Sequence, residues 1–214
     1  MSGVDARRDW LLAQARAFLE ADGVDLKDSQ VALLEQHVAL VREWNAVVGV
    51  VSTGEVDSLW ERHVVDSLSL AGVLARLGIS GGNLVDIGSG GGFPVVPIKI
   101  ALPGLTVTVV ERSEKKLGFL RKVFGALGLT GVAFRHGEFS AGMLAQKTDA
   151  ISARAVERPE KLVGSIEKAI GTGTVFLSQS GVKFGEGFFA ERVEDEWMRS
   201  GLRRGSLDIV RRVG

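Results

Sequence analysis

The glycine-rich run that follows Val85 constrains the fold of this chain more than any other stretch. Apolar residues Leu84–Ile87 lead directly into Gly88-Ser89-Gly90-Gly91-Gly92, and a helix is expected to begin near Pro94. Glycines at such a point let the backbone adopt positive φ angles and approach a ligand closely, because no Cβ stands in the way. An apolar strand that ends in such a loop is typical of an open α/β sheet, which binds its ligands at the carboxyl ends of the strands.

Alternating short β-rich runs and helical patterns continue from residue 83 onward. This alternation predicts a mostly parallel sheet with helices on both faces. Pro159 is expected in the first turn of one of these helices, where its missing N–H costs nothing. The expected strands are Leu84–Ile87, Thr106–Glu111, Val132–Arg135, Ala150–Ala153, Thr174–Leu177 and Leu207–Val213.

The first third of the chain has apolar residues at helical spacing and few turn signals. One helix is predicted with Asp28 or Ser29 as its N-cap, and a second over Val56–Leu77. We therefore expect a helical N-terminal extension over residues 1–80 and a Rossmann-like domain over residues 81–214. The apolar stripe of the first of these helices is Val31, Leu34, Val38, Val41 and Trp44.

Composition narrows the chemistry available to this chain. Lys and Arg total 26 and Asp and Glu total 26, so the formal net charge is zero and any nucleic-acid contact requires a local basic patch. The absence of cysteine excludes disulfides and thiolate chemistry, and with only 3 histidines we expect no metal site. No apolar run reaches membrane-spanning length, and the N-terminus does not resemble a signal peptide, so we expect a cytoplasmic monomer that does not bind membranes.

The ligand of the glycine loop can be narrowed from its neighbours. Phe93 stands where a dinucleotide fingerprint has its third glycine, and Pro94 lacks an N–H that a pyrophosphate would use. Asp86 favours a ligand with a cationic centre, and S-adenosylmethionine carries an ammonium and a sulfonium but no phosphate. Glu111 ends the next strand, where an acid can accept hydrogen bonds from both ribose hydroxyls. A structural glycine turn in a flavodoxin-like domain, with Glu111 merely solvated, stays open as the alternative.

With these residues placed, the chain resembles one family from about Leu40 to Gly181. It is similar to the small-subunit ribosomal RNA guanine-N7 methyltransferases, methyltransferase G, also called glucose-inhibited division protein B. The resemblance implies a class I S-adenosylmethionine-dependent methyltransferase fold. The matching residues are Trp60, Arg62, His63-Val64-Val65-Asp66-Ser67-Leu68, Val85 through Pro94, Val110-Glu111, Lys115-Lys116, Phe119-Leu120, Glu138 and Ser152-Ala153-Arg154-Ala155.

The resemblance implies a set of cofactor-binding residues and no catalytic side chain. Gly88 and Phe93 would line the S-adenosylmethionine pocket, although Phe93 could equally anchor the following helix to the sheet. Gly137-Glu138 stand where the family has Ala-Glu beside the adenine. Arg154 matches the arginine that closes the site, and Glu111 would bind the ribose.

Four departures from the family pattern leave the target nucleotide and the RNA contacts open. Val95 replaces a glycine after Phe-Pro, and His136 replaces an arginine two positions before Glu138. Gly49-Val50 and Ser180-Gly181 replace Asn-Leu and Lys-Gly. Two other functions therefore remain open, a methyltransferase of this fold with a protein or small-molecule substrate and a non-catalytic cofactor-binding module. A nicotinamide dehydrogenase is a third, disfavoured by the loop.

Ribosomal RNA or the small ribosomal subunit is the partner that the resemblance implies. Guanine N7 is an acceptor without a proton, so its methylation needs no general base. Two basic clusters could contact this RNA, but taken alone each is better explained as a solvent-exposed helix face or strand edge. Likewise, a local His63–Asp66 hydrogen bond is as plausible as RNA contact, and Trp44 and Trp60 are expected in the core. The basic clusters are Arg112, Lys115, Lys116, Arg121 and Lys122, and Arg203, Arg204, Arg211 and Arg212.

Overall fold

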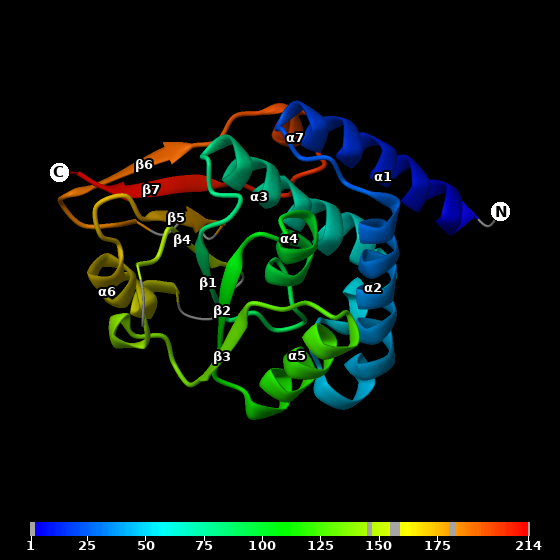
Figure 1. The fold of residues 1–214 in the computed structure, drawn as a ribbon, viewed down its shortest axis with the longest axis horizontal. Helices are drawn as coiled ribbons and strands as arrows, with labels where there is room; N and C mark the ends of the chain where they lie inside the picture. The colour runs from blue at the N-terminus through cyan, green and yellow to red at the C-terminus, as the bar shows by residue number, and fades with distance from the viewer. Residues whose placement is uncertain (1–2, 145–146, 155–158, 180–182, 214) are drawn as a thin grey trace.

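The computed structural model describes residues 3–144, 147–154, 159–179 and 183–213, and places helices around a central sheet (Figure 1). Helix α1, Gly3–Ala21, and helix α2, Asp28–Val48, begin the chain. The expected stripe of α2 is confirmed, since Leu34, Val38 and Val41 are buried and Val31 and Trp44 pack against the same core. The predicted N-cap is wrong: Lys27 has the extended cap conformation, and its N–H donates to Gln30 Oε1 at 2.8 Å.

The single helix expected over Val56–Leu77 is interrupted. A 3₁₀ segment η1, Thr53–Ser58, and a π-helical turn η2, Trp60–Val64, precede helix α3, Val65–Arg76. A π turn inserts one extra residue into a helix, and such turns are frequent at functional sites. The apolar pattern does not reveal this insertion, because the residues on both sides of it remain at helix-like spacing.

The seven strands form one mixed sheet in the order β3-β2-β1-β4-β5-β7-β6. The first five pair in parallel, and β7 pairs antiparallel with β5 and β6. The predicted strands are all confirmed within a residue or so, but β6 was not predicted. The bounds are β1 Asn83–Ile87, β2 Thr106–Glu111, β3 Val132–His136, β4 Ala150–Ala153, β5 Val175–Ser178, β6 Phe188–Arg192 and β7 Asp208–Arg212.

Helices cover both faces of the sheet, as the alternation predicted (Figure 1). On β1, Leu84 belongs to one apolar core with α2–α5, and its neighbour Val85 belongs to a second core with Ile166 of α6. Successive strand residues point to opposite faces, so the two cores lie on the two sides of the sheet. The remaining helices are α4 Val95–Ala101, α5 Glu114–Ala126, the 3₁₀ turn η3 Ala141–Met143, α6 Pro159–Ala169 and α7 Glu196–Arg199.

The N-terminal helices are continuous with the larger core rather than separate from it. Leu19 of α1, Val38 of α2 and Leu70 of α3 are buried in the same cluster as Val109 of β2. The boundary near residue 80 stays a prediction. Within the described ranges, no helix combines the length and apolarity needed to cross a bilayer.

The strand order reverses between β1 and β4, and the carboxyl edge of the sheet at this switch point is called the crevice below. From β1 the chain proceeds to β2 and β3 on one side, and β4 and β5 then lie on the other. Open α/β sheets bind ligands where the strand order reverses in this way, outside the carboxyl ends of the strands. Loops and side chains at the ends of β1, β2, β3 and β4 therefore define where a ligand would bind.

Candidate functional site

The loop after β1 is held in a conformation that requires glycine. Gly88, Gly90 and Gly92 have φ angles of 73°, 52° and 87°, all in the left-handed region. The Gly88 N–H donates to the Val110 carbonyl at 2.8 Å, which ties the start of the loop to β2. The Gly92 N–H donates to the Ser89 carbonyl at 2.7 Å and closes a turn just before α4. The loop is thus a tight backbone structure at the β1 end of the crevice.

Asp86 lies buried directly beneath this loop. Its carboxylate accepts a hydrogen bond from Ser152 Oγ of β4 at 2.6 Å and another from Ser89 Oγ. The pKa of Asp86 is raised to about 6, chiefly by burial and in part by the charge of Glu111, against the opposing effects of the two serine hydroxyls and Arg154. The site therefore keeps a costly anion at its base, which a cationic ligand would stabilise.

Glu111, at the carboxyl end of β2, faces the glycine loop. One carboxylate oxygen accepts the Gly90 N–H at 3.1 Å and the other accepts the Ser113 N–H at 2.9 Å. The residue is 5% exposed. A carboxylate oxygen can accept more than one hydrogen bond, so each could also accept one from a ligand hydroxyl. The carboxylate of Glu111, which the sequence predicted at this strand end, is thus oriented by backbone N–H groups of the glycine loop and of Ser113.

The end of β3 adjoins Glu111. The Gly137 N–H donates to the Glu111 carbonyl at 3.1 Å, and Gly137 has a φ of 125°. Glu138 follows it and is exposed. His136, one of the departures from the family pattern, has its Nε2 3.0 Å from the Arg112 carbonyl and its Nδ1 3.4 Å from Glu114. Of the predicted residues after β3, Gly137 therefore meets Glu111 through the backbone at one edge of the crevice.

Phe93 is buried at the far end of the glycine loop. Its ring lies between two histidine rings, with centroid distances of 4.7 Å to His37 and 4.9 Å to His63. At 6% exposure it fixes the start of α4 against the N-terminal helices. These contacts join Phe93 to α2 and η2 and not to the sheet, to which the anchoring role had assigned it, and its contact with a cofactor stays a prediction.

Arg154, just after β4, is held by the N-terminal helices. Its Nη2 donates to the Arg62 carbonyl at 2.6 Å, and its Nη1 lies 3.2 Å from Asp66 Oδ2. Asp66, 1% exposed, also accepts the Arg204 N–H at 2.8 Å and Gln179 Nε2 at 3.1 Å. Arg154, Gln179 and Arg204, which lie far apart in sequence, therefore all contact the Asp66 carboxylate beside the crevice.

The local His63–Asp66 hydrogen bond considered from the sequence is wrong. Asp66 accepts hydrogen bonds from Gln179 and Arg204, which lie far along the chain, whereas His63 stacks on Phe93 and has its Nε2 3.7 Å from Glu55. Neither this network nor the contact of His37 Nε2 with the Gly91 carbonyl oxygen, at 2.9 Å, was visible in the sequence, because the partners are separated by 54 residues or more. The only sequence signal was the His-Val-Val-Asp-Ser-Leu run itself.

Both basic clusters are neutralised in part, the one on α5 by the ion pair of Arg121 with Glu114 at 3.4 Å. Arg203, 2% exposed, pairs with Asp195 at 2.8 Å, and Arg212 donates to the Ile170 carbonyl, so this cluster is largely structural. In the cluster on α5, Lys115 is exposed, and the Lys122 ammonium lies 4.4 Å from the centroid of Trp44.

Two further expectations concern the core and metals. Trp60 is buried and Trp44 packs against the core, as expected. Across the described residues no group of three or more metal-ligating side chains was found. Ser180-Gly181, a departure from the family pattern, falls outside the described ranges.

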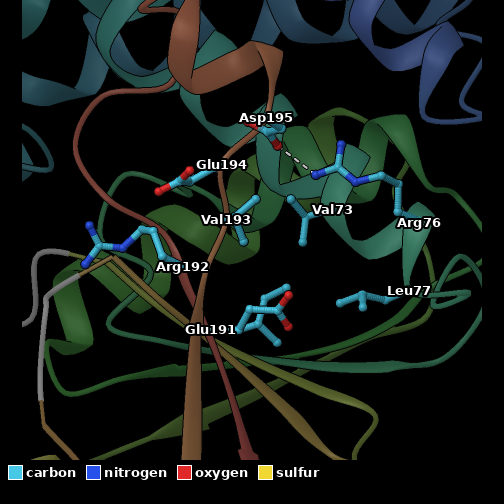
Figure 2. A pocket seen from close by; sticks show the side chains of 9 residues that line it. Val73, Arg76, Leu77, Glu191, Arg192, Val193, Glu194 and Asp195 are labelled. Atoms are coloured by element: carbon cyan, nitrogen blue, oxygen red, sulfur yellow. Dashed lines mark hydrogen bonds and ion pairs between the residues drawn. The ribbon is translucent and has the colours of Figure 1, made fainter.

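A separate hollow of about 450 Å³ lies away from the glycine loop, between α3 and the segment after β6 (Figure 2). Val73 of α3, Leu77 directly after this helix and Val193 line its apolar part, and Arg76 points across it to Asp195, with 2.7 Å between Nη2 and Oδ2. The hollow includes none of the predicted cofactor residues. The candidate site is therefore the crevice edge and not this hollow.

The sheet order, the glycine loop after β1 and the acid at the end of β2 define the class I S-adenosylmethionine-dependent methyltransferase fold. A mutant of MtNAS solved in complex with S-adenosylmethionine is similar over 99% of this chain and 97% of its own, with a TM-score of 0.60 at 16% identity. A putative S-adenosylmethionine-dependent methyltransferase from Methanococcus maripaludis is similar over 83% and 92%, with a TM-score of 0.53 at 12% identity. At these identities the likeness concerns the fold alone.

Sequence comparison identifies the family. The model described as GidB, rRNA small subunit methyltransferase G, matches residues 30–187, and the chain belongs to this family. The ribosomal RNA small subunit methyltransferase G of Sorangium cellulosum is 41% identical over 148 residues, 68% of this chain and 62% of that protein. The protein of the same name from Chromobacterium violaceum is 31% identical over 170 residues, 79% of each chain. The chain thus spans between about three fifths and four fifths of these two relatives.

Proposed function

We propose that this chain transfers a methyl group from S-adenosylmethionine to N7 of a guanosine in 16S ribosomal RNA. Family membership supports the reaction and the substrate. The structural observation that supports the proposal is that two carboxylates contact the glycine loop. The buried Asp86 does so through Ser89, and Glu111 does so through the Gly90 N–H. Together they offer negative charge and hydroxyl acceptors to a ligand that is cationic at one end and a nucleoside at the other.

The residues at the crevice fit S-adenosylmethionine by their chemistry. Each carboxylate oxygen of Glu111 could also accept a hydrogen bond from a ribose hydroxyl, and the anion of Asp86 lies beneath the part of the loop nearest β4. We propose that Gly88 lets the backbone approach the ligand, and that Gly137 and Glu138 lie beside the adenine. Phe93 and Arg154 complete the proposed set, Phe93 by anchoring the loop and Arg154 by closing the β4 side.

The chemistry requires positioning rather than proton transfer. When bound, the cofactor supplies a methyl group on a positively charged sulfur. Guanine N7 has a free lone pair and no proton, so no side chain needs to act as a base. Holding nucleophile and methyl in line can lower such a barrier by roughly 7–11 kcal/mol. In this account the protein acts through the rigid loop and the Asp66-held Arg154, and no residue is catalytic in the sense of exchanging protons.

We propose that ribosomal RNA or the small ribosomal subunit is the partner and that the protein acts as a cytoplasmic monomer. N7 lies in the deep groove of paired RNA, so the target must be an exposed or splayed nucleotide. The exposed cations next to the Glu111 edge, among them Lys115 and Arg135, are suitably placed for its phosphates. With zero net charge, binding must depend on such a local patch and weaken as salt rises.

Methyl transfer from radiolabelled S-adenosylmethionine tests the proposal. Naked 16S ribosomal RNA, small subunits and a total protein extract are compared as acceptors, and the product is mapped to a base and an atom. We expect label at N7 of a guanosine in the RNA or subunit reaction. Label in protein or in small molecules instead would support a different substrate, and cofactor binding without transfer to any acceptor would support a non-catalytic module. Either result contradicts the proposal.

A further inference from the structure

Helix α2 reaches the glycine loop through one buried side chain, His37. The residue is 0% exposed, and its Nε2 lies 2.9 Å from the Gly91 carbonyl oxygen. Its ring packs on Phe93 at 4.7 Å between centroids, and Phe93 in turn packs on His63 at 4.9 Å. The loop is therefore clamped between α2 and the π turn η2, both of which lie outside the sheet.

The hydrogen bond shows that Nε2 of the His37 ring carries a proton. A carbonyl oxygen only accepts, so Nε2 must carry the proton and donate it to Gly91. Burial lowers the pKa of His37 to about 4, which leaves the ring neutral at physiological pH. The Nε2–H tautomer is then the form present, and the buried Nδ1 has no hydrogen-bond partner among the described residues. A buried polar atom left unpaired costs free energy, so a phenyl ring at this position would avoid that cost.

The backbone around Gly91 is closely packed, and side chains at Gly91 and Gly92 would crowd their neighbours. A Cβ on Gly92 would lie 2.7 Å from Val96 Cγ2 and 3.0 Å from His37 Nε2. A Cβ on Gly91 would lie 3.4 Å from the Val50 carbonyl oxygen. On the opposite side, the Gly90 N–H is held by Glu111. The loop is thus held from behind by α2 and the segment after it, and from the ligand side by the acid proposed to bind ribose.

We propose that His37 is a positioning residue for cofactor binding, holding the Gly91 carbonyl so that the Gly90 N–H is directed at Glu111 and the loop is preformed before the ligand arrives. The inference rests on the proposed function, because it assigns the cofactor to this loop. Pre-organisation of this kind raises affinity by removing the cost of ordering the loop on binding. It also gives the N-terminal helices a role in the cofactor site, which the sequence had assigned entirely to the sheet domain.

Three variants distinguish a positioning role of His37 in the loop from a general contribution of α2 to the stability of the fold. His37→Phe keeps a flat ring against Phe93 but removes the donor, and His37→Gln keeps an N–H donor. Val41→Ala is the matched control, because Val41 is a fully buried residue of the same helix and makes no hydrogen bond to the loop. Calorimetric titration with S-adenosylmethionine gives the Kd, and hydrogen exchange of the ligand-free protein reports the loop amides.

We expect His37→Phe to raise the Kd roughly two- to tenfold, the change that one lost hydrogen bond corresponds to, and to speed exchange at Gly90 and Gly92. His37→Gln should restore most of both, and Val41→Ala should lower the melting temperature without changing either. Equal Kd and equal loop exchange for His37→Phe and the natural protein overturn the inference. So does a Val41→Ala variant with the same rise in Kd.

The design distinguishes this inference from the proposed function. Failure of the natural protein to bind S-adenosylmethionine contradicts the function, while exchange in the ligand-free variants still tests the clamp. If His37→Phe does not fold, the ¹⁵N imidazole spectrum of the natural protein decides. A protected Nε2–H on a neutral His37 ring, from pH 6 to pH 8, supports the clamp, and the opposite tautomer or an exchanging proton overturns it.

Discussion

Replacing Asp86 by asparagine tests whether the buried, ionised carboxylate of Asp86 lowers the free energy of unfolding. Burial raises the pKa of Asp86 from its usual 3.8 to about 6. A carboxyl with a raised folded-state pKa favours folding most at low pH, below 3.8, and that contribution is lost as the pH rises through about 6. At neutral pH the ionised group therefore costs about 3 kcal/mol, from a difference of roughly two pKa units at 1.36 kcal/mol each.

We expect Asp86→Asn to stabilise the ligand-free protein by up to about 3 kcal/mol at pH 7.5 and by about half of that at pH 5. For a chain of 214 residues, 1 kcal/mol moves the melting temperature by about 2–4 °C, so a rise of roughly 6–12 °C is the upper limit at pH 7.5. Affinity for S-adenosylmethionine should fall at least tenfold, about 1.4 kcal/mol, because a neutral amide attracts the cationic end less.

Thermal denaturation at the two pH values, and calorimetry with the cofactor, measure these effects. Asp208→Asn serves as the control, since Asp208 accepts from Arg192 on the outer strands and should alter neither the pH dependence nor the Kd. The reasoning is refuted if Asp86→Asn is less stable than the natural protein at pH 7.5, if the difference is the same at pH 5, or if the Kd is unchanged.

Three other substitutions test the remaining parts of the site. Gly88→Val should abolish cofactor binding, since a β-branched residue is strained at a φ of 73°. Unchanged affinity in calorimetry would contradict the proposal that the glycine loop binds the cofactor. Glu111→Ala should weaken binding by roughly 1–3 kcal/mol, with a normal Kd as the contrary result. Arg154→Ala should reduce methyl transfer more than stability, because Asp66 keeps its bond from Gln179; a folded, fully active variant speaks against any role for Arg154.

Much of the sheet was predictable from the sequence because its signals are local. Each of the first five strands is a short apolar run next to a turn or helix pattern, and the glycines after Ile87 mark the edge at which we propose that the ligand binds. Glu111 followed from the same logic, since parallel strands end at the same edge. The strand Phe188–Arg192 escaped prediction because it is an exposed edge strand, with Phe189 57% exposed, in which Phe188 alone of the five residues packs against a core.

What the sequence could not supply are contacts between distant segments. The hydrogen bond from His37 to Gly91 spans 54 residues, and that from Arg204 to Asp66 spans 138. Nothing in the local pattern of α2 distinguishes His37 from an ordinary core residue. The π turn at Trp60–Val64 escaped for a related reason, since one inserted residue leaves the apolar spacing nearly unchanged.

Direct titration of S-adenosylmethionine into the purified protein tests the central claim, that the loop after β1 and Glu111 form the binding site of this cofactor. We predict saturable binding at one site, competition by S-adenosylhomocysteine, loss of binding in Gly88→Val and no heat with a nicotinamide dinucleotide. Absence of binding to S-adenosylmethionine, or binding that Gly88→Val leaves intact, would contradict the account.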